Sequence, residues 1–378
     1  MPTRRVHYHL GMPTTRSATS AAAKAAAAPK LQLVLPAELL EAVLMHLDCK
    51  SLLRAEVVCR LLMALAAMVR SNQDWQALLD MRMRLGDGQM ATWNYPAAVL
   101  MLSGDHANAL YVADDSNSGT LGVLVWNEDG VERGSYRRVS EPFKSYGGPA
   151  ARPRGLAWNR GSSLFLTTTT GQILQYSRDA PCSLFFSAGG TWGKTTFGEH
   201  ITKPYAIAVG HDHIFVTDVQ QVCVSVYERE GLSHVRSFGQ AELAGQPCCI
   251  AVCSHGVVVG DCEDGSLYFF SLTGELKSKQ HMPEISGLSI CSEYLYAASS
   301  GGSETGAALH VARLDQRWWD VEAASTNIYK ACHSPMRIDC PAETYFHAVS
   351  ASEDYVAAST LSNHVLLFRK RGSVKGRS

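Results

Sequence analysis

The sequence predicts a small all-α domain at residues 31–84, followed by an all-β six-bladed propeller at residues 96–370. Two patterns carry this prediction. Near the start of the chain, apolar residues recur at three- and four-residue spacing, which is typical of one face of an α-helix. After residue 95, short alternating strands recur in six similar units. Periods of about 40 to 60 residues built from short strands are typical of propeller blades.

Composition limits the function classes. The chain has 378 residues, with 34 Lys and Arg against 35 Asp and Glu, and 18% of its residues are charged. A nearly neutral chain argues against a general nucleic-acid or membrane-surface binder. The sequence has no apolar run long enough to cross a bilayer and no signal-peptide pattern. We therefore expect a cytoplasmic or nuclear protein, or one found in both compartments.

Both ends of the sequence are basic. Residues 1–30 contain an alanine-rich run and no acidic residue, which predicts a disordered basic leader, with an organelle transit peptide as the alternative. Residues 371–378 form a basic tail.

The cysteine pattern indicates a reducing compartment. The eleven cysteines are an odd number, and several lie inside apolar runs, where free thiols behave as small hydrophobic groups. The nearest Cys/His group, Cys332, His333 and Cys340, lacks the second half of a zinc site. We expect neither a metal nor a cofactor.

The front domain is predicted to begin with an amphipathic helix. One face of this helix carries Leu39, Leu40, Val43, Leu44 and Leu47. Pro36 suits the first helical position, and Ser51 suits the N-cap of a second helix. The first helix therefore has an apolar face that needs a partner.

Two more helices are expected before residue 84. Apolar residues at helical spacing continue over residues 59–69, and Ser71 and Asp74 have capping-box spacing ahead of Trp75. A segment this small can bury only a modest share of its own surface. Its apolar face must pack either on the rest of the chain or on another protein, and the periodicity leaves both possibilities open.

The front segment resembles an F-box. The resemblance rests on Leu35-Pro36, Leu52-Leu53, Val57-Val58-Cys59-Arg60 and Trp75, in matching order and spacing. In that family the helices dock on a Skp-type adaptor, which links them to a cullin and to a ubiquitin-transferring complex. The resemblance implies these adaptor-binding residues: Leu35, Pro36, Leu39, Leu40, Val43, Leu44, Leu47, Leu52, Leu53, Val57, Val58 and Cys59. Leu62 stands where the family often has Trp, which implies a smaller apolar contact.

The rest of the chain repeats one unit of short strands and turns. First strands are expected to open at Pro96, Pro153, Pro204, Pro247, Ile285 and Thr344. Second strands are expected to end at Asp114, Thr168, Asp218, Asp261, Ser299 and Ser359. The copies resemble NHL-type repeats, because an apolar-Val-x-Asp pattern recurs and the signatures of WD and kelch repeats are absent.

The last unit has no fourth strand of its own. We expect Met90–Asn94, within a linker at residues 85–95, to supply it and so to remove an exposed edge. A chain entering there arrives on the face that carries the turns between first and second strands. The helical domain is therefore expected on that face, with the opposite face free.

The predicted inner strands offer little for catalysis. Matching positions carry Val99, Leu156, Ile207, Ile250, Leu288 and His347, so His347 alone could bind a metal, and a single His is more often structural. The sequence has no nucleophile elbow or phosphate loop in a fitting context. We predict a non-catalytic protein. The alternative is a propeller hydrolase, lyase or small-ligand binder whose front helices pack on the same chain.

The recurring Asp114, Asp218 and Asp261 indicate a structural role, in which each carboxylate accepts N–H bonds from the following turn. We also expect Trp318 and Trp319 to pack between blades.

The free face is expected to bind a target protein. Its loops carry the candidate substrate-binding residues Arg152, Arg154, His200, Lys203, Tyr205, Gln220, Gln221, Glu263 and Asp264. One side of this set is cationic with an aromatic anchor, which suits an acidic or phosphorylated segment. Together with the F-box resemblance, this leads to the hypothesis of a substrate receptor in a Skp-cullin-F-box ubiquitin ligase.

Overall fold

The computed structural model describes residues 75–80, 95–103, 108–115, 120–126, 135–139, 152–159, 163–178, 192–198, 200–300, 308–314, 316–319, 336–339, 345–361 and 363–370. The chain divides into two compact units, residues 1–59 and 60–378, and every described residue belongs to the second unit. The helices predicted before residue 75 lie outside the described residues. In the described part, no helix is long and apolar enough to span a membrane.

Within these ranges, the chain forms six four-stranded antiparallel sheets, which we number by their first strands. Sheet 1 contains β2 (Pro96–Ser103), β3 (Asn108–Asp114), β4 (Thr120–Trp126) and β5 (Ser135–Val139). Sheet 2 contains β6 (Pro153–Asn159), β7 (Ser163–Thr168), β8 (Ile173–Arg178) and β9 (Trp192–Phe197). Sheet 3 contains β10 (Pro204–Val209), β11 (His213–Asp218), β12 (Cys223–Glu228) and β13 (His234–Phe238).

The other three sheets follow the same plan. Sheet 4 contains β14 (Pro247–Val252), β15 (Val257–Asp261), β16 (Ser266–Phe270) and β17 (Leu276–His281). Sheet 5 contains β18 (Ile285–Cys291), β19 (Tyr294–Ser299), β20 (Ala308–Arg313) and β21 (Met336–Asp339). Sheet 6 contains β22 (Phe346–Ala351), β23 (Tyr355–Thr360), β24 (Val365–Lys370) and β1 (Trp75–Asp80).

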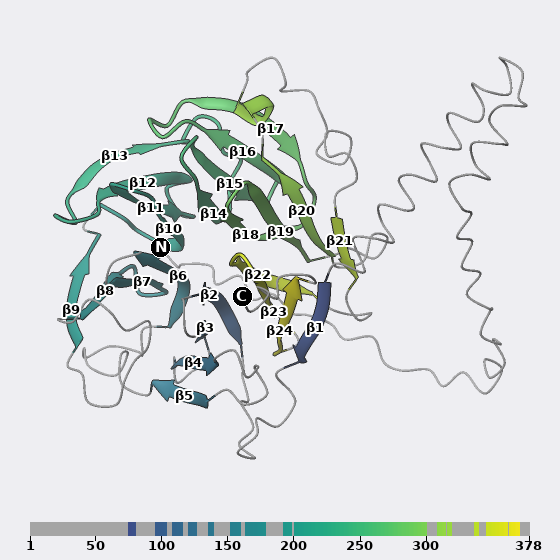
Figure 1. Ribbon diagram of the computed structural model, residues 1–378. Coiled ribbons are helices and arrows are strands. Elements are labelled where there is room, and N and C mark those ends of the chain that lie inside the picture. The colour runs from purple at the N-terminus through teal and green to yellow at the C-terminus, as the bar shows by residue number, and fades with distance from the viewer. Residues whose placement is uncertain are drawn as a thin grey trace, which may run out of the picture. The chain divides into compact units, whose positions relative to one another are not determined.

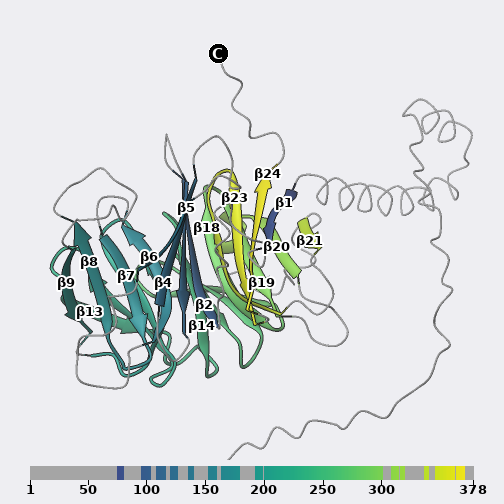
Figure 2. The same cartoon turned by 90° about the horizontal axis from the view of Figure 1, so that it is seen from below.

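The first strands of the sheets form the inner wall of a ring (Figure 1). Contacts run in order from β2 to β6, β10, β14, β18 and β22, and from β22 back to β2. The fourth strands lie at the rim, and in the side view the strands run between the two faces of the ring (Figure 2). A closed ring of four-stranded antiparallel sheets is consistent with a β-propeller.

Neighbouring inner strands approach closely at glycines. A Cβ on Gly155 of β6 would lie 2.8 Å from the carbonyl oxygen of Tyr205 in β10. A Cβ on Gly287 of β18 would lie 2.8 Å from Cα of Ala348 in β22. Such distances leave no room for a side chain. At each of these contacts, a residue near the start of one inner strand meets a residue near the start of the next inner strand. The inner strands therefore run in the same direction.

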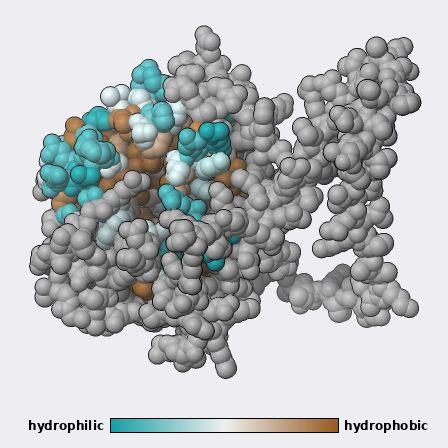
Figure 3. All heavy atoms as spheres, in the orientation of Figure 1, coloured by the Kyte–Doolittle hydropathy of each residue, from teal (hydrophilic) through white to brown (hydrophobic). Residues whose placement is uncertain are grey.

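Buried aromatic and aliphatic side chains fill the spaces between sheets. One cluster joins Trp126 of sheet 1 to Tyr355 and Leu367 of sheet 6. Another includes Trp318 and Trp319 of the 3₁₀ helix η2 (Gln316–Trp319), which contacts β16 and β17. Both indoles are 7% exposed, which confirms the packing role predicted for them. On the face shown in Figure 3, hydrophilic residues gather at the rim around β13, and hydrophobic ones show nearer the centre.

Sheet 6 takes its fourth strand from the front of the chain. β1 pairs with β24, with Trp75 opposite Lys370 and Asp80 opposite Leu366. Two predictions are therefore wrong. The residues after Asp74 form a strand instead of a fourth helix, so the all-α domain does not extend to residue 84. The ring-closing strand is β1 and not Met90–Asn94, which lie outside the described residues.

The wrong helix prediction has a physical reason. β1 has only six residues, in which Trp75, Ala77 and Leu79 fit strand alternation and Trp75, Leu78 and Leu79 fit helical spacing equally well. A segment this short takes the structure that its surroundings offer, and the open edge of β24 offers backbone hydrogen bonds.

The last unit begins two residues later than predicted. Its first strand opens at Phe346 and not at Thr344, and its second strand ends at Thr360 and not at Ser359. The predicted starts and ends are confirmed for the other five units. The first four units open with proline, which marks the strand start, whereas the last unit opens with Phe346 and lacks that mark.

This shift changes the place of His347. It is the second residue of its strand, and Val349 occupies the position that matches Val99. The fourth position of every inner strand, which was compared for metal ligands, therefore carries an aliphatic residue. His347 belongs instead to the residues at the second position.

Candidate binding site on one face of the ring

The same backbone hydrogen bond marks one end of all six described sheets. In each sheet, the N–H of the residue after the second strand donates to the carbonyl of the residue before the first strand. The pairs, donor first, are Asp115 and Tyr95, Thr169 and Arg152, Val219 and Lys203, Cys262 and Gln246, Ser300 and Glu284, and Leu361 and Tyr345. Because the inner strands run in the same direction, these pairs gather on one face of the ring, which we call the site face.

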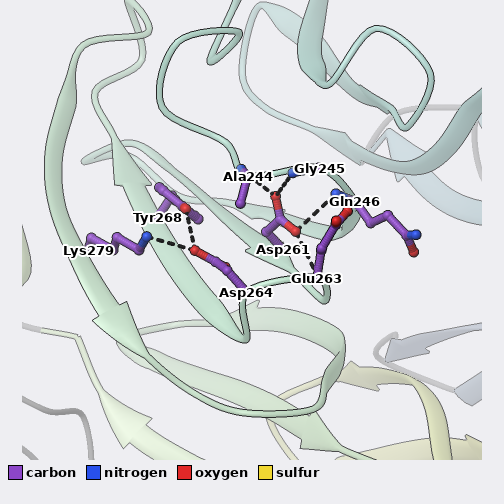
Figure 4. A network of polar contacts seen from close by, with 8 residues as sticks. All are labelled: Ala244, Gly245, Gln246, Asp261, Glu263, Asp264, Tyr268 and Lys279. Atoms are coloured by element: carbon purple, nitrogen blue, oxygen red, sulfur yellow. Dashed lines mark hydrogen bonds and ion pairs between the residues drawn. The ribbon is translucent and has the colours of Figure 1, made fainter.

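Asp261 holds the loops of sheet 4 together at the site face (Figure 4). Its Oδ2 accepts bonds from the N–H groups of Ala244 at 2.9 Å and Gly245 at 3.0 Å. Its Oδ1 accepts bonds from the N–H groups of Gln246 and Glu263, each at 3.0 Å. One buried carboxylate thereby ties the connection before the first strand to the turn after the second strand.

Asp218 does the same in sheet 3. It accepts four backbone N–H bonds, from Thr202, Lys203, Gln220 and Gln221. In sheet 1, Asp114 accepts a bond from the N–H of Tyr95 at 2.9 Å. The structural role predicted for the recurring aspartates is confirmed in sheets 3 and 4, where the turn that follows donates to the carboxylate. The same carboxylates also hold the preceding connection, which was not predicted.

The register shifts directly after the first residue of every inner strand. In sheet 2, Pro153 pairs with Thr168 and Gly155 with Thr167, which leaves Arg154 out of register. The residues at this second position are Ala97, Arg154, Tyr205, Cys248, Ser286 and His347. Bulges of this kind re-aim side chains and are frequent beside functional sites. The second positions therefore form a ring on the inner wall next to the site face.

Arg154 is the charged member of this ring. Its Nη2 lies 2.9 Å from Oδ2 of Asp115, and Nε of Arg152 lies 3.4 Å from Oδ1 of the same carboxylate. The guanidinium carbon of Arg154 lies 5.5 Å from the ring centre of Tyr205 and 6.0 Å from that of Tyr95. We call these five residues the arginine cluster.

Burial differs within the arginine cluster. The side chain of Asp115 is 3% exposed, that of Arg154 is 24% exposed and that of Arg152 is 43% exposed. Burial raises the pKa of Asp115, while the two guanidinium groups act in the opposite direction. Burial also raises the pKa of the Tyr205 hydroxyl, which therefore stays neutral at physiological pH.

His347 lies beside the arginine cluster as a neutral group. Its ring centre is 5.2 Å from that of Tyr95, in an edge-on arrangement. Burial and the nearby Arg154 lower the pKa of His347 to about 4. Its buried Nδ1 has no hydrogen-bond partner in the described part of the chain. The imidazole is therefore uncharged at neutral pH.

Two cysteines at this face, Cys248 and Cys262, are protonated thiols. Sγ of Cys248 lies 3.8 Å from Sγ of Cys249, and this contact raises the pKa of Cys248. A contact with Cys248 raises the pKa of the more exposed Cys262. Since the thiolate is the reactive form, these thiols are poor nucleophiles. Within the described ranges, no group of three or more His, Cys, Asp or Glu is placed to hold a metal ion.

An apolar pair lies on the site face at sheet 6. Tyr345 is 48% exposed and Leu361 is 44% exposed, and the N–H of Leu361 donates to the carbonyl of Tyr345 at 2.8 Å. Tyr345 is two residues before His347, which contacts Tyr95. The apolar pair therefore belongs to the sheet whose His347 contacts the arginine cluster.

The structure places all nine predicted substrate-binding residues at the site face, but their side chains differ in availability. Asp264 pairs with Lys279 and accepts a bond from Tyr268, both at 2.7 Å (Figure 4). Despite burial, which acts the other way, these bonds lower the pKa of Asp264. Gln221 donates to Oγ1 of Thr202 at 2.7 Å. The side chains of Asp264 and Gln221 thus already have partners within the chain.

Other predicted residues remain open to solvent. The exposed ones are His200, Lys203, Gln220 and Glu263, and the ring of His200 lies 4.8 Å from that of His234. Arg152, Arg154 and Tyr205 meet in the arginine cluster. The contribution of each residue to binding stays a prediction.

Sequence reasoning missed Tyr95, Asp115 and Tyr345. A usable signal existed, because Tyr95 and Tyr345 each directly precede a first strand, where residues of the site face are expected. Asp115 follows the recurring Asp114, and this second acid could have been noted as the partner of the two arginines.

Comparison with protein families identifies an F-box domain at residues 33–74. The chain therefore contains an F-box domain, as its sequence pattern predicted. This segment and all twelve predicted adaptor-binding residues, from Leu35 to Cys59, lie outside the described residues. No curated protein matches the chain.

The chain has low similarity to the solved structures that it matches. A catalytically inactive virginiamycin B lyase from Staphylococcus aureus with quinupristin has a TM-score of 0.46 at 10% identity, covering 72% of this chain and 80% of that one. A nidogen/laminin complex has a TM-score of 0.46 at 15% identity, covering 67% of this chain and 85% of that one. Similarity at this level carries no conclusion about activity or partners.

Proposed function

We propose that this chain is the substrate-recognition subunit of a Skp-cullin-F-box ubiquitin ligase. The observation that carries the proposal is the F-box domain at residues 33–74, because F-box domains bind Skp-type adaptors. We assign the adaptor contact to the twelve residues of the F-box segment that the resemblance implies. They are Leu35, Pro36, Leu39, Leu40, Val43, Leu44, Leu47, Leu52, Leu53, Val57, Val58 and Cys59.

The six sheets act in this proposal as the blades of one NHL-like propeller that binds a target protein. Support comes from the closed ring of inner strands and from the loops of the site face, which buried aspartates hold in place. The chain enters the ring at Trp75, which pairs with Lys370 at the end opposite the site face. The site face is therefore free of the chain entry.

The contribution of this subunit to ubiquitin transfer is positioning. Bringing two reactants together in a defined geometry accelerates their reaction without any covalent step on the positioning protein. The proposal places the protein in the cytoplasm, the nucleus or both, where cullin-dependent ligases act.

The proposal is tested by pull-down of a purified Skp-type adaptor with the full chain. The intact chain is expected to retain the adaptor, and Leu35→Ala with Pro36→Ala is expected to weaken retention at least tenfold, because it removes apolar contact area. The matched control is Tyr345→Ala with Leu361→Ala on the site face, which leaves adaptor retention unchanged.

Failure of the intact chain to bind the adaptor would contradict the proposal. Metal analysis of the purified protein gives an independent check, because one equivalent of tightly bound metal per chain would favour a propeller enzyme over a binding subunit.

A further inference from the structure

Arg154 has unused hydrogen-bond donors, and its neighbours hold the side chain in place. A guanidinium group has five N–H donors. Among the described residues, the only hydrogen-bonding partner of this guanidinium is the carboxylate of Asp115, at 2.9 Å from Nη2. The other donors of Arg154 lie on the inner wall next to the site face, where a ligand can reach them.

The position of this guanidinium is set by its neighbours. The rings of Tyr95 and Tyr205 lie 6.0 Å and 5.5 Å from its carbon, within cation–π range. The backbone of Tyr205 is itself held, because its carbonyl accepts a bond from Oγ1 of Thr167 in sheet 2. A preorganised Arg loses less entropy on binding than a flexible surface cation.

The five residues of the arginine cluster carry one net positive charge, which can pair with one negative charge on a ligand. Arg152 and Arg154 supply two positive charges, and Asp115 offsets one of them. The carboxylate of Asp114 is next in sequence, accepts a bond from the N–H of Tyr95 and brings the net charge of the surroundings to zero. His347 is neutral and adds no charge. A carboxylate, with one negative charge, is repelled less by Asp114 and Asp115 than a phosphate, which carries nearly two.

An apolar surface adjoins the charge. Tyr345 and Leu361 are 48% and 44% exposed, and Tyr345 is followed two residues later by His347, whose ring contacts Tyr95. Arg154 and the pair of Tyr345 and Leu361 thus lie on the same face of the ring, in sheets 2 and 6, on either side of sheet 1. Aromatic anchors beside an arginine are typical of the residues that dominate binding interfaces.

We propose that the site face recognises a carboxylate in an extended segment of the target protein, with an apolar residue close to that carboxylate. The guanidinium of Arg154 binds the carboxylate through its free N–H groups, and Tyr345 with Leu361 binds the apolar side chain. This inference rests on the proposed function, because it names the chemistry of the target that the ligase would recognise. The carboxylate comes either from Asp or Glu side chains or from a chain terminus.

The probes are four libraries of ten-residue peptides with random flanking residues. Three have amidated C-termini and carry a fixed Glu, Gln or phosphoserine at the centre, and the fourth carries Gln with a free C-terminal carboxylate. Retention of each library by the full chain is measured. The Glu library is expected to exceed the amidated Gln library about tenfold, the size expected for a hydrogen-bonded charge pair.

The free-terminus library distinguishes the two sources. If it also exceeds the amidated Gln library, a terminal carboxylate serves as ligand; if it does not, the carboxylate belongs to a side chain. The retained Glu peptides are expected to be enriched in Leu, Ile or Phe within three residues of Glu. This enrichment is expected to disappear with Tyr345→Ala and Leu361→Ala.

The decisive variant is Asp115→Asn with Arg154→Gln. It removes both charges of the pair together, so that no buried carboxylate is left without its partner. The preference for Glu is expected to disappear. The matched control, Glu293→Gln with Arg313→Gln, removes an exposed ion pair at the opposite face, where Arg313 Nη2 lies 2.7 Å from Glu293, and keeps the preference.

A second variant tests the inference in case the double variant does not fold. Arg154→Lys keeps a positive charge beside Asp115 but lacks the planar fork, and it is expected to reduce the preference for Glu several-fold. Equal retention of the Glu, free-terminus and amidated Gln libraries by the intact chain overturns the inference, as does stronger retention of the phosphoserine library. An unchanged Glu preference in both Arg154 variants also overturns it.

Adaptor binding, measured on the same samples, separates this inference from the proposed function. A chain that binds the adaptor but prefers neither the Glu nor the free-terminus library refutes only the carboxylate site. A chain that prefers Glu but does not bind the adaptor refutes only the ligase role.

Discussion

Sheets 3 and 4 differ from sheet 6 in how their strands are brought together. Each of the first two is built from four consecutive strands, and a buried aspartate joins its loops through four backbone N–H bonds. Sheet 6 takes β1 from the front of the chain and has Thr360 where the other two have Asp218 and Asp261. The first arrangement is local in sequence, and the second depends on closing the ring.

This difference explains which parts of the fold the sequence pattern revealed. Sheets 3 and 4 carry their own register marks, proline at the start and aspartate at the end of the first hairpin. Sheet 6 has neither mark, and its outer strand is chosen by a long-range contact. The predictions below test whether local bonds or ring closure contribute more to stability.

The largest effect is expected for Asp261→Ala. This change removes the acceptor for four backbone N–H groups, and bonds to a charged group contribute more than neutral ones. We expect a loss of about 4 kcal/mol in the free energy of unfolding, measured by urea denaturation. Asp261→Asn keeps one oxygen and is expected to lose about half as much. A loss below about 1 kcal/mol in Asp261→Ala would show that these bonds do not hold the loops together.

Ring closure by β1 is tested with adjacent prolines. Successive strand residues point their N–H groups in opposite directions, so Gln76→Pro with Ala77→Pro removes at least one N–H that faces β24. We expect a loss of about 3 kcal/mol in the free energy of unfolding.

The control for β1 is Ala91→Pro with Thr92→Pro, in the segment that sequence reasoning assigned to ring closure. These prolines are expected to leave the denaturation midpoint almost unchanged. The reverse result, with the larger loss at residues 91 and 92, would show that the closing strand had been assigned to the wrong segment.

A smaller effect is expected where inner strands cross. Gly287→Ala places a Cβ 2.8 Å from Cα of Ala348 and from the backbone N of Val349. Sheets 5 and 6 must then move apart, at a cost of about 2 kcal/mol by analogy with overpacked cores. The measurement is the thermal unfolding midpoint. Gly231→Ala is the control, because its Cβ would meet the flexible side chain of Glu228, and it is expected to change the midpoint little.

The last effect, no larger than that of Gly287→Ala, is a dependence on pH at His347. Because its pKa is lowered from 6.5 to about 4, the unfolded chain binds more protons than the folded one between these values. Stability from this group is therefore fully present above pH 6.5 and is lost as the pH falls towards 4. Between pH 7 and pH 5 the loss is about 2 kcal/mol.

Denaturation curves of the intact chain and of His347→Gln at both pH values measure this contribution. The variant lacks the titrating ring, so its stability is expected to fall less over the same interval. Parallel losses in the two proteins would assign the pH dependence to other groups.

Much of the ring could be predicted because the repeats are marked locally. Pro204 and Asp218 bound one hairpin, and Pro247 and Asp261 bound its copy, so strand ends follow from residue types. The fourth strand of sheet 6 could not be predicted in this way. The six residues of β1 have no distinguishing period, and their strand structure depends on the edge of β24, which is distant in sequence.

The candidate site was predicted in part. Loop positions followed from the topology of a four-stranded sheet, so Arg152, Arg154 and Tyr205 were correctly placed on one face. The carboxylate of Asp115, which pairs with both arginines, was not anticipated. The shift of His347 to the second position of its strand was also missed, because no proline marks the start of β22.

The sequence by itself determined the F-box at residues 33–74 and the repeated hairpins, because both depend on spacing within short segments. The tertiary structure decided which strand closes the ring and which side chains meet around Arg154. Those outcomes depend on contacts between residues far apart in the chain. β1 pairs with β24, and Asp115 of sheet 1 meets Arg154 of sheet 2, only once the sheets have packed side by side.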